Sequence, residues 1–149
     1  MRKDSEILKM LIHAGARLDV LDTTGGTPLA NAVRFQRDEN VKLLLEAGAD
    51  VDMAGERCDT PLLLAARLGR MDYLNALLER GADVNKAGEL GATPLYTAML
   101  EGQEEVARRL IQAGANVILQ VNGYTPLHWA KVSNMPLVVS QLLKMGVAD

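Results

Sequence analysis

Few residues in this chain have the types and spacing that catalysis or metal binding requires. Its two histidines, His13 and His128, lie far apart in the sequence, and its single cysteine, Cys58, has Arg57 and Asp59 as neighbours. A reactive thiolate needs a nearby base or cation, and a zinc site needs several Cys or His ligands at short spacing. Arg57 could lower the pKa of Cys58, but no partner histidine or resolving cysteine accompanies it. We therefore expect an inert or incidentally modifiable thiol, no catalytic residue, no metal site and no cofactor.

Two further motifs have simpler structural explanations. Gly25-Gly26 lacks the flanking Lys-Ser/Thr of a phosphate-binding loop, so a hairpin turn explains it better. Glu101, Glu104 and Glu105 form an acidic cluster. A solvated helix face with favourable charge at a helix N-terminus is the simpler interpretation, and contact with a basic partner is the alternative. The sequence thus predicts a protein that is not an enzyme.

Length and composition indicate a folded chain with an interior of short side chains. The chain has 149 residues, which suits one compact domain or a short array of repeats. Hydrophobic residues make up 48% and charged residues 23%, so disorder is not expected. Because aromatic residues make up only 3%, leucine and alanine must fill the interior. Thin layers of short helices suit that composition better than a thick sandwich.

Charge and targeting signals bear on location and partners. The formal net charge of −3 argues against a nucleic-acid or anionic-membrane partner, because such binding needs basic patches. One cysteine cannot form an intrachain disulfide, which favours a reducing compartment. No apolar run approaches the ~20 residues of a membrane span, and the first six residues lack a secretory signal. We expect an intracellular protein, in the cytoplasm, the nucleus or both.

Two short motifs recur with one period along the chain. Thr-Pro-Leu occurs four times, in steps of 33, 33 and 32 residues, beginning at Thr27, Thr60, Thr93 and Thr125. Gly-Ala followed by a polar or acidic residue begins at Gly15, Gly48, Gly81 and Gly114, with a degenerate copy at Gly146. Such a period is the signature of a repeat architecture.

Each repeat is predicted to form two short antiparallel helices and a hairpin-like loop. Thr27 and its equivalents can cap a helix whose first residue is the following proline. The second helix carries paired aliphatic residues at helical spacing and ends at the glycine of Gly-Ala. Pro136 falls at the start of its second helix, where proline is tolerated.

The repeats resemble ankyrin repeats, whose pattern is Gly-x-Thr-Pro-Leu-His-x-Ala-Ala followed by Leu-Leu-Leu and Gly-Ala-Asp-Val-Asn. The segments that carry the resemblance are 60–66, 81–85 and 123–130. The resemblance implies an all-α solenoid of stacked helix-turn-helix units with hairpin loops, with about four helix pairs after a leading single helix. We expect one domain, 1–149, made of a partial repeat 1–19 and repeats at about 20–52, 53–85, 86–118 and 119–149.

Several positions depart from the family pattern. Only His128 keeps the histidine, which the resemblance implies is a structural hydrogen-bonding group. The hairpin before Thr125 is one residue short, and its segment 116–121 is unusually apolar. The first unit has a second helix over Ser5 to Ala14 with no first helix before it. These ends suggest a segment of a longer array or ends that stack on a neighbouring copy, although self-sufficient terminal helices are an alternative.

The resemblance also places the residues that are free to bind a partner. They lie just before each Thr-Pro-Leu and seven or eight residues after its threonine. The candidate partner-binding residues are Arg34, Phe35, Glu56, Arg57, Arg67, Leu68, Glu89, Leu90, Leu100, Glu101 and Tyr124. We therefore predict a scaffold that binds another protein on its concave and hairpin surface; an end-to-end assembly module and an engineered ankyrin-type binder are alternatives. Ordinary packing is the competing explanation for Phe35 and Leu68, and packing is the favoured one for Trp129.

One modification site is suggested by the same resemblance. Similar repeats are substrates of an asparaginyl hydroxylase that favours a leucine eight residues before the asparagine of Asp-Val-Asn. Leu77 and Asn85 have that spacing. The alternative is that Asn85 is the consensus residue that satisfies its own hairpin.

Overall fold

The structure, a computed structural model, describes residues 2–55 and 58–148. Within these ranges the chain forms nine short α-helices, and its only β-type pairing is an isolated bridge between Val121 and Tyr124. The helices are α1 (Arg2–His13), α2 (Pro28–Arg34), α3 (Asp38–Glu46), α4 (Pro61–Leu68), α5 (Met71–Glu79), α6 (Pro94–Leu100), α7 (Glu104–Gln112), α8 (Pro126–Val132) and α9 (Pro136–Lys144), with a 3₁₀ turn at Glu89–Gly91.

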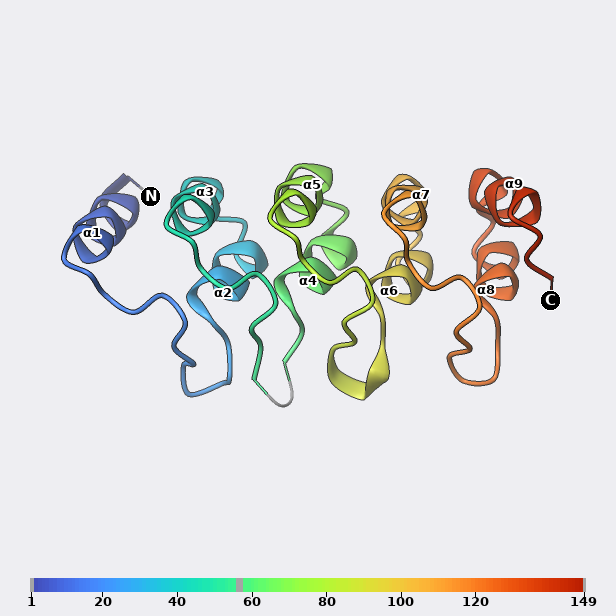
Figure 1. Cartoon of the computed structure of the whole chain (residues 1–149), viewed down its shortest axis with the longest axis horizontal. Helices are drawn as coiled ribbons and strands as arrows, with labels where there is room; N and C mark the ends of the chain where they lie inside the picture. The colour runs from blue at the N-terminus through green and yellow to red at the C-terminus, as the bar shows by residue number, and fades with distance from the viewer. Residues whose placement is uncertain (1, 56–57, 149) are drawn as a thin grey trace.

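The helices stack in two parallel rows (Figure 1). We call α1, α3, α5, α7 and α9 the outer helices and α2, α4, α6 and α8 the inner helices. Loops that precede each inner helix project from its side of the stack, away from the outer helices (Figure 1). Four helix pairs follow the single helix α1, which confirms the predicted solenoid. In the described part of the chain, no helix combines the length and apolarity needed to cross a bilayer.

Threonine caps start the inner helices, as the sequence predicts. Thr27, Thr60, Thr93 and Thr125 have extended backbones, and each is followed by proline at the first helical position. Each hydroxyl oxygen accepts a hydrogen bond from the backbone N–H three residues later, at 3.1 to 3.2 Å. The cap satisfies a backbone donor that would otherwise have no partner at the helix start.

Residues in the left-handed conformation end the helices. Gly48, Gly81 and Gly114 follow α3, α5 and α7 with φ of 82°, 82° and 94°. The turn between the two helices of each pair needs the same conformation, which is adopted in successive pairs by Gln36, Gly69, Gly102 and Asn134. Glycine adopts this region without steric cost and asparagine tolerates it, whereas the glutamine adopts it at a steric cost.

Leucine and alanine form one continuous core along the stack. Leu44, Leu77, Leu110 and Leu142 of the outer helices are each at most 1% exposed. Fully burying a leucine side chain contributes about 1.5–3 kcal/mol. The inner helices contribute alanines that have no exposed surface, namely Ala65, Ala98 and Ala130. Their small side chains allow neighbouring inner helices to approach closely.

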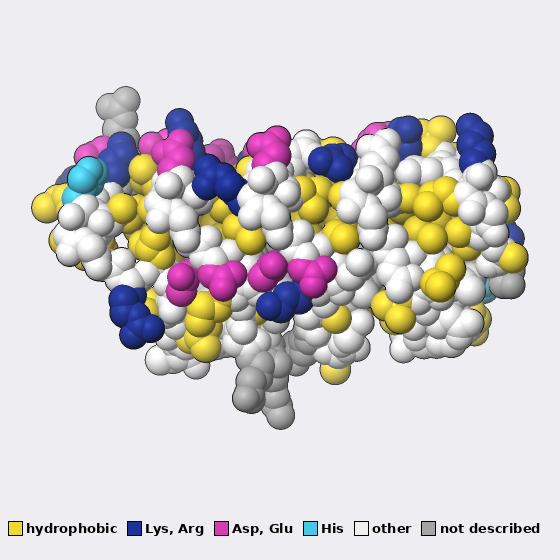
Figure 2. Space-filling model, in the orientation of Figure 1, with side chains coloured by type: hydrophobic (Ala, Val, Ile, Leu, Met, Phe, Trp, Pro, Cys, Tyr) yellow, Lys and Arg dark blue, Asp and Glu magenta, His cyan; other side chains and the backbone are white. Residues whose placement is uncertain are grey.

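A series of polar side chains links each unit to the next. In each link a side-chain oxygen of one unit accepts a hydrogen bond from a backbone N–H group of the next unit. The pairs are Asp19 with the N–H of Asp50 at 2.8 Å, Asp52 with that of Asp83 at 3.0 Å, and Asn85 with that of Asn116 at 2.7 Å. Figure 2 shows a row of acidic side chains crossing one face of the stack below the outer helices. At the last junction Ile118 replaces the polar residue, so this link is missing there.

Glu104 supplies a different link at that last junction. Its Oε1 accepts hydrogen bonds from the backbone N–H groups of Leu137 and Val138, at 2.7 and 3.3 Å. The carboxylate of α7 therefore caps the N-terminus of α9, where negative charge is favourable. The acidic cluster is thus not wholly a solvated face, because Glu104 holds two units together.

The shortened fourth hairpin closes through a tight turn. Asn122 and Gly123 have φ of 54° and 79°, and Val121 and Tyr124 exchange two backbone hydrogen bonds of 3.0 and 3.1 Å. Two consecutive residues with positive φ are what a type I′ turn requires, and Asn-Gly is its preferred sequence. The missing residue therefore shortens the turn without disturbing the stack.

The cap of α4 yields a stability prediction. Thr60→Ala should lower the free energy of unfolding by about 1 kcal/mol, because the Leu63 N–H loses its partner in a buried position. Urea denaturation followed by circular dichroism measures the change. Thr60→Ser keeps the hydroxyl and should lose less. Equal losses in both variants would show that the methyl group, and not the cap, stabilises this position.

Candidate protein-binding surface

Seven predicted residues form a row of accessible side chains along the inner helices. Each inner helix ends in side chains that point away from the core, and Phe35, Leu68 and Leu100 are 65%, 36% and 56% exposed. We define the inner surface as Arg34, Phe35, Arg67, Leu68, Leu100, Glu101 and Tyr124, all of them exposed. Phe35 therefore does not fold back over the neighbouring unit. Binding of a partner by this surface remains a prediction.

One cation of the inner surface is already paired. Arg67 Nη1 lies 2.7 Å from the Asp59 carboxylate, which is only 12% exposed. The pair joins the residue before Thr60 to the end of α4, so it orients the guanidinium along the inner surface. The Arg67 side chain is 44% exposed, so solvent weakens the attraction between the two charges. Arg34 is exposed on the preceding helix.

Aromatic residues gather at the far end of the inner surface. Tyr124 stacks on the His128 ring with centroids 4.3 Å apart, and Trp129 meets the rings of Tyr96, Tyr124 and His128 edge to face. Trp129 Nε1 also donates a 3.4 Å hydrogen bond to the carbonyl of Val121. Such pairs stabilise by about 0.5–1.5 kcal/mol each. Trp129 is thus a packing residue that fixes the fourth hairpin, and Tyr124 keeps 48% of its surface exposed.

The remaining predicted sites lie on hairpins or outside the described residues. Glu56 and Arg57 fall outside the described ranges, as does the side chain of Glu89. Leu90 lies at a hairpin tip with φ of 62° and is 97% exposed. Asn85 is exposed and bonds to the next hairpin through Asn116. That contact gives the asparagine a structural role, and its modification remains a prediction.

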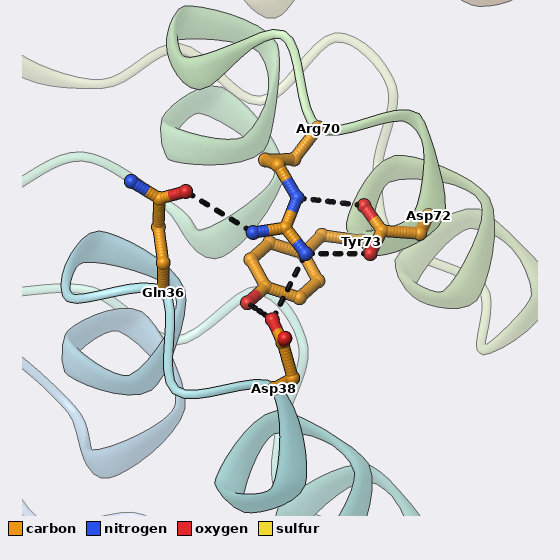
Figure 3. Close-up of polar contacts among 5 residues, drawn as sticks. All are labelled: Gln36, Asp38, Arg70, Asp72 and Tyr73. Carbon is orange, nitrogen blue, oxygen red and sulfur yellow. Dashed lines mark hydrogen bonds and ion pairs between the residues drawn. The ribbon is translucent and has the colours of Figure 1, made fainter.

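Sequence analysis missed a polar cluster that joins the second and third units (Figure 3). Arg70 donates hydrogen bonds of 3.0 and 2.7 Å to Asp72, one of 2.9 Å to Asp38 and one of 3.1 Å to Gln36. The guanidinium also lies 4.0 Å from the centre of the Tyr73 ring, and the Tyr73 hydroxyl donates to Asp38. Comparing repeats by position does not reveal it, because Arg70 and Tyr73 occur in one unit and Asp38 in another.

The cluster shifts the pKa values of its members. Hydrogen bonds from Tyr73 and Arg70 lower the pKa of Asp38, and the bond from Arg70 lowers that of Asp72. Burial, together with the bond to Asp38, raises the pKa of Tyr73 to about 12. The cluster therefore keeps two carboxylates ionised beside one arginine. Asp38, Asp72 and Tyr73 line a groove of about 260 Å³ between α3 and α5. Arg70 pairs with both carboxylates, so we interpret the cluster as a junction between units.

The residues with catalytic potential lie apart from one another. Cys58 is partly buried, and its thiol donates to the carbonyl of Thr24 at 3.1 Å, across two hairpins. His13 Nδ1 lies 2.7 Å from the carbonyl of Lys9 in the same helix. Over residues 2–55 and 58–148, no three His, Cys, Asp or Glu side chains are grouped as a metal site would need.

Comparison with known families agrees with this architecture. A family model described as ankyrin repeats in three copies matches residues 1–88 and 85–149, so the chain belongs to the ankyrin-repeat family. A search of curated proteins finds no match. Ankyrin repeats are in general protein-protein interaction modules and are typically not enzymes.

The polar cluster yields a pH prediction. A lowered pKa of Asp38 in the folded state means that the unfolded chain binds more protons, so stability falls on acidification below the ordinary value of 3.8. Tyr73→Phe removes the largest cause of the shift. The loss of stability as the pH falls below about 4 should become shallower in this variant.

Urea midpoints across this pH range measure that slope. Tyr96→Phe is the matched control, because its hydroxyl contacts the Asn122 amide and no carboxylate. An unchanged acid slope in Tyr73→Phe would contradict the role given to this hydroxyl.

Proposed function

We propose that this protein is a non-catalytic scaffold whose inner surface binds another protein. The observation that carries the proposal is the row of exposed side chains at the ends of successive inner helices, from Arg34 and Phe35 through Arg67 to Leu100. Large apolar side chains exposed in one row indicate an interaction site more often than scattered ones do.

The inner surface combines the residue types that dominate protein interfaces. Phe35 and Tyr124 supply aromatic area, and Arg34 and Arg67 supply charge beside them. Truncating such residues in an interface often costs about 2 kcal/mol or more. The threonine caps of the inner helices and their packing against neighbouring helices hold these side chains in place before binding, which reduces the ordering cost of association.

Several finer expectations support an adaptor role inside the cell. The single cysteine favours a reducing compartment, cytoplasmic or nuclear. The net charge of −3 argues against nucleic acid or an anionic membrane as the partner. Hydroxylation of Asn85 remains part of the proposal, and mass spectrometry of native material that shows no added oxygen at Asn85 would remove it.

End-to-end stacking of copies is a second candidate. Leu143 of α9 is 55% exposed, whereas Leu45 and Ile111 at the same position of α3 and α7 are 5% and 4% exposed because the next unit covers them. Sedimentation at increasing concentration distinguishes the candidates, because stacking requires a size that grows with concentration.

The scaffold proposal predicts a loss of binding without a loss of folding. Phe35→Ala, Arg67→Ala and Tyr124→Ala, combined in one variant, should abolish most partner capture from lysate, measured by quantitative mass spectrometry against wild type. Phe35 and Tyr124 are 65% and 48% exposed, so the thermal midpoint should fall only by what the loss of the Tyr124 ring contacts and the Arg67–Asp59 ion pair accounts for.

Lys42→Ala on outer helix α3 is the matched control, because Lys42 is exposed on the opposite row. Unchanged capture by the triple variant would refute the inner-surface proposal. A large fall in the thermal midpoint would instead support packing roles for these residues.

A further inference from the structure

The repeats offer an internal comparison of the grooves between successive outer helices. Between α3 and α5 the groove has a volume of about 260 Å³. Arg80, which follows the last residue of α5, crosses it and donates to the carbonyl of Leu45. Between α5 and α7, Arg109 crosses in the same way and donates to Asn75 at 2.8 Å. At both junctions an arginine of one unit reaches back to the unit before it.

Among the residues described, no arginine donates across the groove between α7 and α9, which is larger, about 600 Å³. Met145 stands where α5 has Arg80, and Gln141 stands where α7 has Arg109. Gln141 Nε2 makes a long contact of 3.5 Å to the carbonyl of Arg108. Its Oε1 is buried and has no hydrogen-bond partner among the residues described. A buried acceptor without a donor is costly, so this groove contains an unmet hydrogen-bond requirement.

The rim of this groove departs from the repeat pattern in polarity. The second residue of the outer helices is Glu39, Asp72 and Glu105 in turn, but α9 has Leu137, which is 48% exposed. Met145 is 53% exposed on the same groove, and Ile111 lies in its wall. Apolar side chains gather over α7 and α9 on the face drawn in Figure 2. An apolar residue thus replaces an acidic one in the groove of about 600 Å³, the larger of the two whose volumes are compared.

The charge at the C-terminal end of the outer helices also changes along the stack, from negative to positive. The last residue of the outer helices is Glu46, Glu79 and Gln112 in turn, and in α9 it is Lys144. Arg108 also lines the groove, but it is paired with Glu105 at 3.1 Å. The Glu104 carboxylate accepts a hydrogen bond from the Leu137 N–H at the N-terminus of α9. Lys144 is thus the cation left for a partner, since it has no ion pair within the described ranges.

We propose that the groove between α7 and α9 is a second docking site, on the outer side of the stack, for an amphipathic helix of another protein. The partner helix presents an aliphatic stripe to Leu137 and Met145, which are 48% and 53% exposed, and an acidic side chain to Lys144. A groove between two packed helices accepts the side-chain ridge of a third helix, which favours a helical partner.

This site is independent of the inner surface. Its lining residues belong to outer helices, and both of its walls are helices of this chain. A partner on the inner surface therefore leaves the groove free, and one molecule can hold two proteins at once.

A selection with a defined probe tests the proposal. A phage-displayed library of three-helix scaffolds, randomised on one helix face, is panned on the whole chain and counter-selected against Leu137→Glu. Clones that survive should combine aliphatic residues at helical spacing with Asp or Glu. Lys144→Glu should weaken their Kd by at least about tenfold.

Matched variants separate this site from general surface effects. Lys42→Glu makes the same charge change in the α3–α5 groove and should leave the Kd unchanged. The second residue of the outer helix is acidic in α3, α5 and α7. Leu137→Glu introduces an acidic residue at that position of α9, so the thermal midpoint of this variant should stay near that of wild type. The triple inner-surface variant should bind the same clones as wild type does.

Several results would overturn the proposal. No clone surviving counter-selection, or survivors that bind Lys144→Glu as tightly as wild type, would exclude an acidic helix from this groove. Survivors that lose binding to the triple variant would assign the interaction to the inner surface. Self-association of the chain that Leu137→Glu abolishes would identify the occupant as a second copy and not another protein.

Discussion

Burial of aliphatic side chains between adjacent helix pairs is the interaction on which the rest of this structure depends. Leu44, Leu77, Leu110 and Leu142 are almost completely buried, yet each sits in a helix of only nine residues. Helices this short are marginal in isolation, so their stability comes from packing against neighbours. One pair cannot cover its own apolar face, and the core therefore runs through the stack as a single layer.

Backbone hydrogen bonding sets the register of that layer. Threonine hydroxyls accept hydrogen bonds from backbone N–H groups in the first turn of the inner helices. Side-chain oxygens of Asp19, Asp52 and Asn85 accept hydrogen bonds from backbone N–H groups of the following unit. Because these contacts recur at the same place in successive units, the units stack without slipping. The side chains at the ends of the inner helices take no part in this arrangement and remain available for a partner.

Differences between otherwise equivalent junctions concentrate on the outer side of the stack. The first complete pair is joined to the next by the Arg70 cluster, whereas the last pair is joined by Glu104 at the start of α9. The core barely changes along the chain, but the groove residues do. The position after the last residue of the outer helix is Arg80 in α5 and Met145 in α9, and the second position of that helix is acidic in α3, α5 and α7 but is Leu137 in α9. A repeat protein can vary these positions at little cost to folding, since the shared core does not involve them.

Local and periodic features of this protein were determined by its sequence alone. The phase of the repeats, the threonine caps and the glycine termini all follow from residues close together in one unit, where short-range rules apply. The exposure of Phe35, for which packing was the competing explanation, was decided by the tertiary structure. Tertiary structure decided the contacts between residues about one repeat apart or more. These include Tyr73 with Asp38, Glu104 with α9 and Cys58 with Thr24, and a periodic pattern does not specify which side chains meet across a junction. The inner surface was predicted as a set of positions, but the pairing of Arg67 with Asp59 and the stacking of Tyr124 on His128 depended on side-chain geometry that only the packed units provide.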